Sequence, residues 1–232
     1  MMLAVSTRSP RKTKKKQRRC SRQMPGKRNG NGNDDRARQT LAQEAARIIV
    51  EQGVRDYRVA KIKAAERLGL NSRGALPGNA EIELAISNHH ALFGGDSHAD
   101  FLRLMREVAI SAMELLDVFT PRLVGPVLQG TADENSAVNL HVFCDSPEPV
   151  AMQLSDSGYN YRPYERRLKT SRGKGATPSS FVGFQFDYKG ECVEATVFPV
   201  DGIRQSPISP IDGKPMKRAD RKAVEALLSA SR

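Results

Sequence analysis

The side chains best suited to chemistry occur in one stretch of the chain, residues 122–145. Its centre, Gly130 to Ser136, is a polar run of turn-forming residues. Asn139 and His141 follow this run, two positions apart. Side chains two apart on a β-strand point to the same face, so an amide and an imidazole would share one surface. We therefore expect a polar pocket, with a strand as the element that positions its side chains.

Two strands are expected to hold the polar run. After it, Val138, Leu140 and Val142 alternate with other residues, and this period of two indicates a strand with two unlike faces. Before it, the apolar run from Leu123 to Leu128 predicts the first strand. A loop between two strands is a frequent place for a binding site, because the strands fix the loop while it faces a ligand.

The sixteen residues from Gly125 to Leu140, GPVLQGTADENSAVNL, resemble the signature of the nucleotidyltransferase superfamily, which has the minimal polymerase-beta-like fold. In that family a Gly-Ser pair follows the first strand, and two alternating acidic residues lie on the next. The matching residues are Gly125, Gly130, Thr131, Ala132, Ser136 and Leu140. The resemblance implies an α+β fold from Phe101 onward. It also implies nucleotide contacts from the matching glycine and hydroxyl positions, which are Gly125, Gly130, Thr131 and Ser136.

The departures from this signature fall on the metal site. The Ser of the family is replaced by Pro126, and the two metal-binding Asp are replaced by Ala137 and Asn139. In the family those carboxylates hold Mg²⁺ ions that bridge the nucleotide phosphates and the attacking oxygen. Alanine has no ligand atom, and asparagine supplies only a neutral carbonyl. The sequence therefore predicts a retained scaffold that has lost its metal-binding carboxylates.

One further carboxylate of the family has a counterpart in this chain. The family places a third acidic residue on a later strand between apolar residues, and Val193-Glu194-Ala195 matches that pattern. The resemblance thus implies a catalytic role for Asn139 and Glu194, and a metal-binding role for Glu194. His141 is a further candidate metal ligand, because it shares a strand face with Asn139. Imidazole suits transition metals better than Mg²⁺. The other interpretation of Glu194 is a solvent-facing residue on an alternating strand.

These matches and losses leave three hypotheses for function. The first is a catalytically degenerate scaffold that binds a nucleotide and needs no cofactor. The second is an active enzyme that uses Mg²⁺ or Mn²⁺ to transfer a nucleoside monophosphate from an NTP to an acceptor. The third is a non-catalytic module that binds nucleic acid or another protein through the basic N-terminus.

The positive charge of the chain is concentrated at its N-terminus. The formal net charge is +11, and residues 1–38 hold 13 Lys and Arg against two acidic residues, whereas residues 39–232 hold 24 of each sign. So polar a segment cannot bury enough surface to fold, and we expect a disordered basic tail over 1–38. The side chains expected to contact phosphate backbones are Arg11, Lys12, Lys14, Lys15, Lys16, Arg18 and Arg19. A solvated tail without a role, and translation that begins at Met24, are the alternatives.

The location of the protein is inferred from what the chain lacks. No apolar core of a secretory signal follows the N-terminal charges, and no run approaches the roughly 20 apolar residues of a membrane span. Three scattered cysteines, Cys20, Cys144 and Cys192, show no metal spacing. These features indicate a cytoplasmic protein without a membrane partner. They leave its oligomeric state open.

Residues 39–95 are expected to form a helical unit. Apolar spacing predicts three helices, which are Leu41–Gln52 capped by Thr40, Asp56–Leu68, and Ala80–Leu92. A helix-turn-helix for DNA is disfavoured, because Pro77 and Gly78 interrupt the segment that would form its recognition helix. The unit is therefore expected to pack on the next domain or on a partner.

Residues 96–232 are expected to form the nucleotidyltransferase-like domain. The predicted elements are a helix Phe101–Val118 capped by Asp100, a helix from Pro147 to Ser157, strands Tyr159–Thr170, Ser179–Tyr188 and Glu191–Val200, and a final helix from Ala219 or Asp220. A basic cluster accompanies the first of these strands, and consists of Arg162, Arg166, Arg167, Lys169, Arg172 and Lys174. It either contacts phosphate or protects an exposed strand edge. The predicted fold is α+β, a helical unit followed by a mixed sheet with flanking helices.

Overall fold

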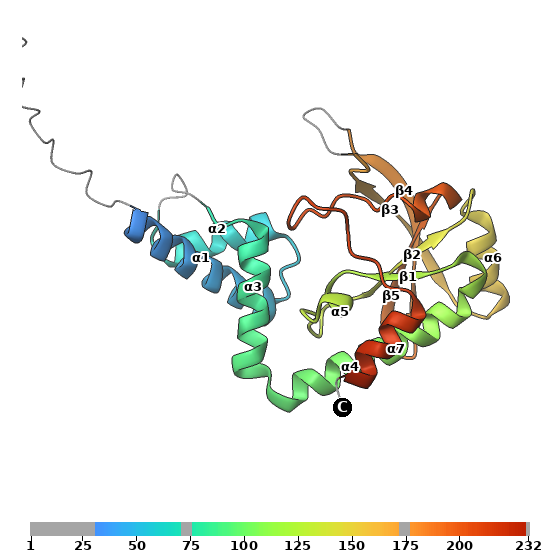
Figure 1. Cartoon of the computed structure of the whole chain (residues 1–232), viewed down its shortest axis with the longest axis horizontal. Coiled ribbons are helices and arrows are strands. Elements are labelled where there is room, and N and C mark those ends of the chain that lie inside the picture. The colour runs from blue at the N-terminus through green and yellow to red at the C-terminus, as the bar shows by residue number, and fades with distance from the viewer. Residues whose placement is uncertain (1–30, 71–75, 172–176, 231–232) are drawn as a thin grey trace, which may run out of the picture.

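The computed structural model describes residues 31–70, 76–171 and 177–230 (Figure 1). Most of the expected basic tail lies outside these residues, including all seven of the side chains from Arg11 to Arg19 named above. The structure corrects the end of the tail, because helix α1 spans Asn31–Gln52 and includes residues 31–38. Arg38 ties this part of α1 to the fold, since its Nε lies 3.1 Å from a carboxylate oxygen of Glu81.

Three helices form the N-terminal unit and bury a hydrophobic cluster of their own. These are α1, α2 (Tyr57–Arg67) and α3 (Asn79–His89). Asp56 caps α2, because its carboxylate accepts a hydrogen bond of 2.7 Å from the amide of Arg58. The predicted cap Thr40 is wrong: it lies inside α1, where its hydroxyl donates to the Arg36 carbonyl over 2.9 Å.

A π-helical turn, His90–Gly94, joins α3 to the long helix α4, which spans Gly95–Leu115. Helix α4 therefore begins before the predicted cap at Asp100. The apolar stripe of α4 is the feature that the sequence predicts well, because it buries Leu102, Met105 and Val108 against the sheet. Among the described residues, no helix is long and apolar enough to cross a membrane.

The C-terminal part of the chain builds a five-stranded mixed sheet, and the α+β prediction is confirmed. The strand order is β1-β2-β5-β4-β3; β2 and β5 are parallel and the other neighbours are antiparallel. The strands are β1 (Arg122–Val124), β2 (Val138–Phe143), β3 (Tyr161–Leu168), β4 (Ser179–Tyr188) and β5 (Glu191–Phe198). The remaining helices are α5 (Pro126–Gln129), α6 (Glu148–Asp156) and α7 (Arg221–Ala230), with 3₁₀ turns at Asp117–Phe119 and Val200–Ile203.

The first strand is shorter than predicted. Strand β1 ends at Val124, and Val127 and Leu128 belong to the short helix α5. The cause is local: Gly125 adopts φ +75°, a left-handed conformation that breaks the strand, and Pro126 favours the first position of a helix. The apolar run looked continuous in the sequence because a strand and a helix turn both bury it.

The two faces of the sheet differ in what covers them. Val138, Val193 and Phe184 face the main core, together with α4, α6 and α7 (Figure 1). The opposite face carries Asn139 and Glu194, because side chains alternate along β2 and β5. The segment 199–218 crosses part of this second face, and a small apolar cluster anchors it there, made of Phe143, Leu168, Phe198, Phe181, Ile203 and Met216.

Candidate functional site

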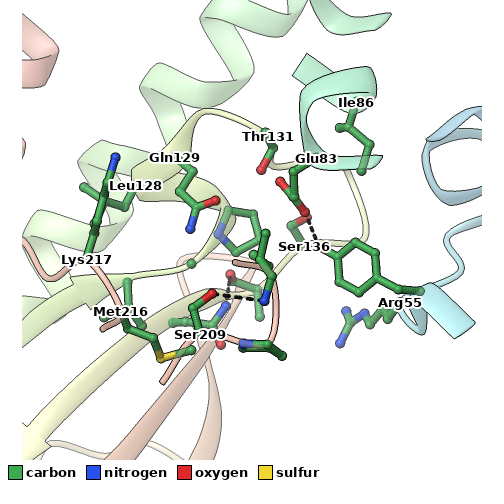
Figure 2. A pocket seen from close by; sticks show the side chains of 18 of the residues that line it. Arg55, Glu83, Ile86, Leu128, Gln129, Thr131, Ser136, Ser209, Met216 and Lys217 are labelled. Carbon is green, nitrogen blue, oxygen red and sulfur yellow. Dashed lines mark hydrogen bonds between the residues drawn. The ribbon is translucent and has the colours of Figure 1, made fainter. Parts of the chain in front are cut away.

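A cleft of about 1080 Å³ lies between the helical unit and the polar face of the sheet. Its walls come from α3 and the α1–α2 connection, from β1 and residues 125–137, and from the segment 209–219. Figure 2 shows Arg55, Glu83 and Ile86 on one side of this cleft, with Met216 and Lys217 on the other. The site is thus formed jointly by the two parts of the fold.

The loop that the sequence singles out forms one wall of the cleft. Of its four expected nucleotide-binding residues, Gly125, Thr131 and Ser136 line the cleft. Gly130 does not: it has φ +82°, ends helix α5, and its carbonyl lies 3.4 Å from His98 Nε2. Thr131 Oγ1 is buried and has no hydrogen-bond partner within residues 31–70, 76–171 and 177–230. Unpaired buried polar atoms are uncommon in folded proteins, so this atom is an unusual feature of the loop.

Internal hydrogen bonds fix the shape of this loop. The carboxylate of Asp133 accepts from the Asn135 amide over 2.9 Å and from the Ser136 hydroxyl over 2.8 Å. The Ser136 hydroxyl also accepts from the Asp133 amide over 3.0 Å. These contacts use the Ser136 hydroxyl inside the loop, so its contribution to the site is to hold the loop in place.

The expected catalytic pair meets at the base of the cleft. Asn139 on β2 and Glu194 on β5 are direct register partners on neighbouring parallel strands, and both line the cleft. Arg166 joins them: its Nη1 donates to Asn139 Oδ1 over 3.1 Å, and its Nη2 forms a short ion pair with Glu194 Oε2. The Glu194 side chain is only 14% exposed. Its interpretation as a solvent-facing residue is therefore wrong.

Arg166 reaches this pair from β3, which is separated from β5 by β4. A glycine on the intervening strand makes room for Tyr164, because a Cβ at Gly183 would collide with the ring of Tyr164. Tyr164 extends across β4, and its hydroxyl lies 2.8 Å from Thr196 Oγ1 on β5. The Arg166 guanidinium lies over the Tyr164 ring, 5.3 Å from its centroid.

His141 lines the same cleft but is engaged by another arginine. Arg218 Nε donates to His141 Nδ1 over 3.0 Å, and the imidazole is almost fully buried. Burial, helped by the charges of Arg218 and Arg166, lowers the pKa of His141 to about 3. Burial and the nearby charge of Arg122 also lower the pKa of Arg218, to about 10. His141 is therefore a neutral acceptor at physiological pH.

These residues do not fit a divalent metal site. Ala137 supplies no ligand, the Asn139 carbonyl and the Glu194 carboxylate both accept from Arg166, and His141 Nδ1 accepts from Arg218. A guanidinium at these oxygens would repel a cation placed beside it. Within residues 31–70, 76–171 and 177–230, no group of three His, Cys, Asp or Glu side chains is arranged to hold a metal ion.

The helical unit contributes polar groups that the sequence did not single out. The Tyr57 hydroxyl donates to Glu83 Oε1, whereas Glu83 Oε2 is buried and has no partner among the residues that the structure describes. Burial, together with the Glu83 hydrogen bond, raises the pKa of Tyr57. Arg55 links the helical unit to the sheet domain, because its guanidinium donates a hydrogen bond to the backbone carbonyl of Asn135.

Arg218 is the other site residue that the sequence does not single out. For Arg166 the sequence predicts a basic cluster that contacts phosphate or protects a strand edge, but not its contact with Asn139 and Glu194. Tyr164, Arg166 and Leu168 alternate on one face, and these three are less exposed than the residues between them. No local pattern marks Arg218 or Glu83, since their positions in the cleft depend on long-range packing.

Comparison of the chain with models of known protein families, with curated proteins and with solved structures gave no match.

Proposed function

We propose that this protein is a catalytically degenerate scaffold of the nucleotidyltransferase type that binds a nucleotide in the cleft. The observation that carries the proposal is the pairing of Asn139 with Glu194 on the parallel strands β2 and β5. The resemblance implies that acidic residues of the family stand at these two places. Two residues that are 55 positions apart in the chain thus meet at the base of one cleft.

The order of elements before Asn139 supports the same proposal. A strand ends at a left-handed glycine, a short helix follows, and a polar loop leads into the next strand. The loop lines a cleft whose volume, about 1080 Å³, suits a nucleotide-sized ligand. Thr131 and Glu83 belong to its wall, and each has one buried polar atom, Oγ1 and Oε2, without a hydrogen-bond partner in the described part of the chain.

The proposal favours binding over catalysis. Nucleotidyl transfer as the family performs it relies on metal ions held by paired carboxylates. Of the three positions where the resemblance implies acidic residues, 137, 139 and 194, only Glu194 is a carboxylate, and the charge of Arg166 neutralises it. Asn139 and Glu194 are therefore assigned to the binding site as structural residues rather than to a reaction.

A second function, nucleic-acid binding by the N-terminus, is favoured by the segregation of charge. The first 38 residues carry the whole net charge of +11, and the other 194 residues are balanced. A basic segment attached to a neutral fold suits a sequence-independent contact with phosphate backbones. This function and the nucleotide site are independent of each other.

A thermal-shift titration of the full chain with nucleotides tests the main proposal. A ligand that binds only the folded state raises the melting temperature. We expect a saturable shift with at least one nucleotide, and the same shift in EDTA as in Mg²⁺ or Mn²⁺. A shift that appears only with metal would favour the active enzyme. Without a shift for any nucleotide, the nucleotide-binding function is wrong.

A further inference from the structure

One guanidinium occupies the place where the resemblance implies a metal ion. Arg166 contacts an oxygen of Asn139 and an oxygen of Glu194, the two residues at the implied metal-ligand positions. A cation between two oxygen ligands on neighbouring parallel strands is the same electrostatic arrangement that a metal ion would make. The difference is that this cation is covalently part of the chain.

The asparagine at position 139 suits a guanidinium neighbour better than a metal ion. The Asn139 amide nitrogen donates to the Ala137 carbonyl over 3.1 Å, so its oxygen is free to accept from Arg166. An Asp at this position has no donor and would place a carboxylate oxygen against the Ala137 carbonyl. The asparagine thus satisfies both neighbours at once, which a metal-binding carboxylate cannot do.

Packing holds Arg166 in this position. Its side chain is one-third exposed, and its partner Glu194 is 14% exposed, so the pair is shielded from solvent more than a surface ion pair. The Tyr164 ring lies beneath the guanidinium and is itself held by Thr196. Two hydrogen bonds among the described residues use Nη1 and Nη2, whereas a guanidinium has five N–H donors.

We propose that Arg166 is a tethered cation that replaces the divalent metal, and that its remaining N–H groups bind a phosphate of the ligand without metal. The phosphate part rests on the proposed nucleotide-binding function. The replacement part rests on the resemblance, which implies the metal site, but it does not require that a nucleotide binds. Guanidinium groups suit this role, since their planar donors match both carboxylate and phosphate oxygens.

Mn²⁺ binding, followed by the electron paramagnetic resonance signal of the free ion, tests the replacement. The variants are A137D/N139D with Arg166 retained, and A137D/N139D/R166M. We expect the wild type and the first variant to bind no Mn²⁺, and the second to bind it, with an affinity gain of at least about tenfold over the first. Circular dichroism checks the fold, and an R166Q version takes the place of R166M if that variant unfolds.

Three results would overturn the replacement. They are Mn²⁺ binding by the wild type, equal binding by both aspartate variants, and absence of binding by a folded triple variant. The first would mean that the metal site survives, the second that Arg166 does not exclude the ion, and the third that these positions do not form a metal site.

A nucleotide-binding experiment distinguishes a failure of this proposal from a failure of the proposed function. R166M should weaken metal-free nucleotide binding by about 10- to 100-fold, since charge-assisted hydrogen bonds to phosphate are lost. R167M is the matched control, because Arg167 is exposed on the same strand and faces the other way. Equal affinity of R166M and R167M would overturn the phosphate part. If no nucleotide binds the wild type, the proposed function fails, and the Mn²⁺ experiment alone decides on Arg166.

Discussion

The ring of Tyr164 occupies the space where Gly183 has no side chain. The two residues are register partners on β3 and β4, and Gly183 is in turn the partner of Thr196 on β5. This single missing Cβ lets the Tyr164 hydroxyl reach Thr196 across the intervening strand. Arg166, whose own partner on β4 is Phe181, lies with its guanidinium over the Tyr164 ring and reaches Glu194. The glycine therefore gives the Tyr164 ring its place over β4, and Arg166 lies against that ring.

Substituting Gly183 with Ala should displace Tyr164 and destabilise the fold by roughly 1–3 kcal/mol, the usual range for overpacking. The expected cause is the collision of the new Cβ with the Tyr164 ring and the loss of the hydrogen bond to Thr196. Urea denaturation would measure the change in unfolding free energy.

A double-mutant cycle with Y164A provides the control for this prediction. Without the Tyr164 ring the new Cβ loses the atoms that it would collide with. G183A should therefore lower the free energy of unfolding much less in the Y164A background than in the wild type. Equal costs in both backgrounds would show that the glycine is needed for a reason other than the crossing of Tyr164.

The sequence predicts those elements that have a local cause. The alternation of Ser179–Tyr188 gives β4 at its exact bounds, and α6 begins at Glu148, one residue after the predicted start at Pro147. Val138 to Val142 likewise predicts β2, and the resemblance directs attention to Asn139 and Glu194. These features depend on neighbours within a few residues, which a periodicity can detect.

The part of the site that the sequence does not predict depends on contacts between distant residues. Arg218 meets His141 over a separation of 77 positions, and Tyr57 meets Glu83 across two helices. For Arg166 the sequence predicts either a phosphate contact or the protection of an exposed strand edge. The strand is indeed an edge, but the guanidinium lies over the Tyr164 ring and against Glu194, a contact that no local pattern predicts.

The buried imidazole of His141 should make stability fall in acid. Its pKa is lowered to about 3 in the folded protein, against about 6.5 for an ordinary histidine. Between these values the unfolded chain binds the proton and the folded protein does not, so acidification favours unfolding. The contribution of His141 is full above about pH 6.5 and decreases by about 1.4 kcal/mol for each pH unit below it, down to about pH 3.

Comparison with H141N isolates this contribution. Asparagine keeps an acceptor for Arg218 Nε and does not titrate. Urea denaturation at several pH values gives the free energy of unfolding of each protein. This free energy should fall more steeply in acid for the wild type than for H141N, and the two pH curves should be parallel above neutral pH. Parallel curves over the whole range would mean that His141 takes up its proton at the same pH in the folded and the unfolded protein.

The charge balance of the cleft should favour nucleotides with few phosphates. Among the described residues, its charged side chains are four cations, Arg55, Arg166, Lys217 and Arg218, and four carboxylates, Glu83, Asp133, Glu194 and Asp212. Without a metal ion, a triphosphate brings negative charge that this lining does not neutralise. For each nucleoside, we expect the monophosphate to give a larger thermal shift than the triphosphate in EDTA and low salt.

Charge reversal at the cleft provides the control for this preference. D212K replaces an exposed carboxylate of the wall by a cation and should shift the preference toward the triphosphate. A wild-type preference for triphosphates in EDTA would contradict the charge argument, and it would point to a phosphate site with more cations than the cleft contains.

The basic N-terminus should bind nucleic acid independently of the cleft. The change is replacement by Ser of Arg11, Lys12, Lys14, Lys15, Lys16, Arg18 and Arg19, which preserves the length of the chain. Fluorescence anisotropy with a labelled duplex, measured over a range of salt concentrations, should show weaker binding and a shallower salt dependence, because fewer counterions are released. R166M is the matched control, since it alters the cleft alone and should leave the salt slope unchanged. An unchanged slope in the serine variant would exclude these seven side chains as the source of nucleic-acid affinity.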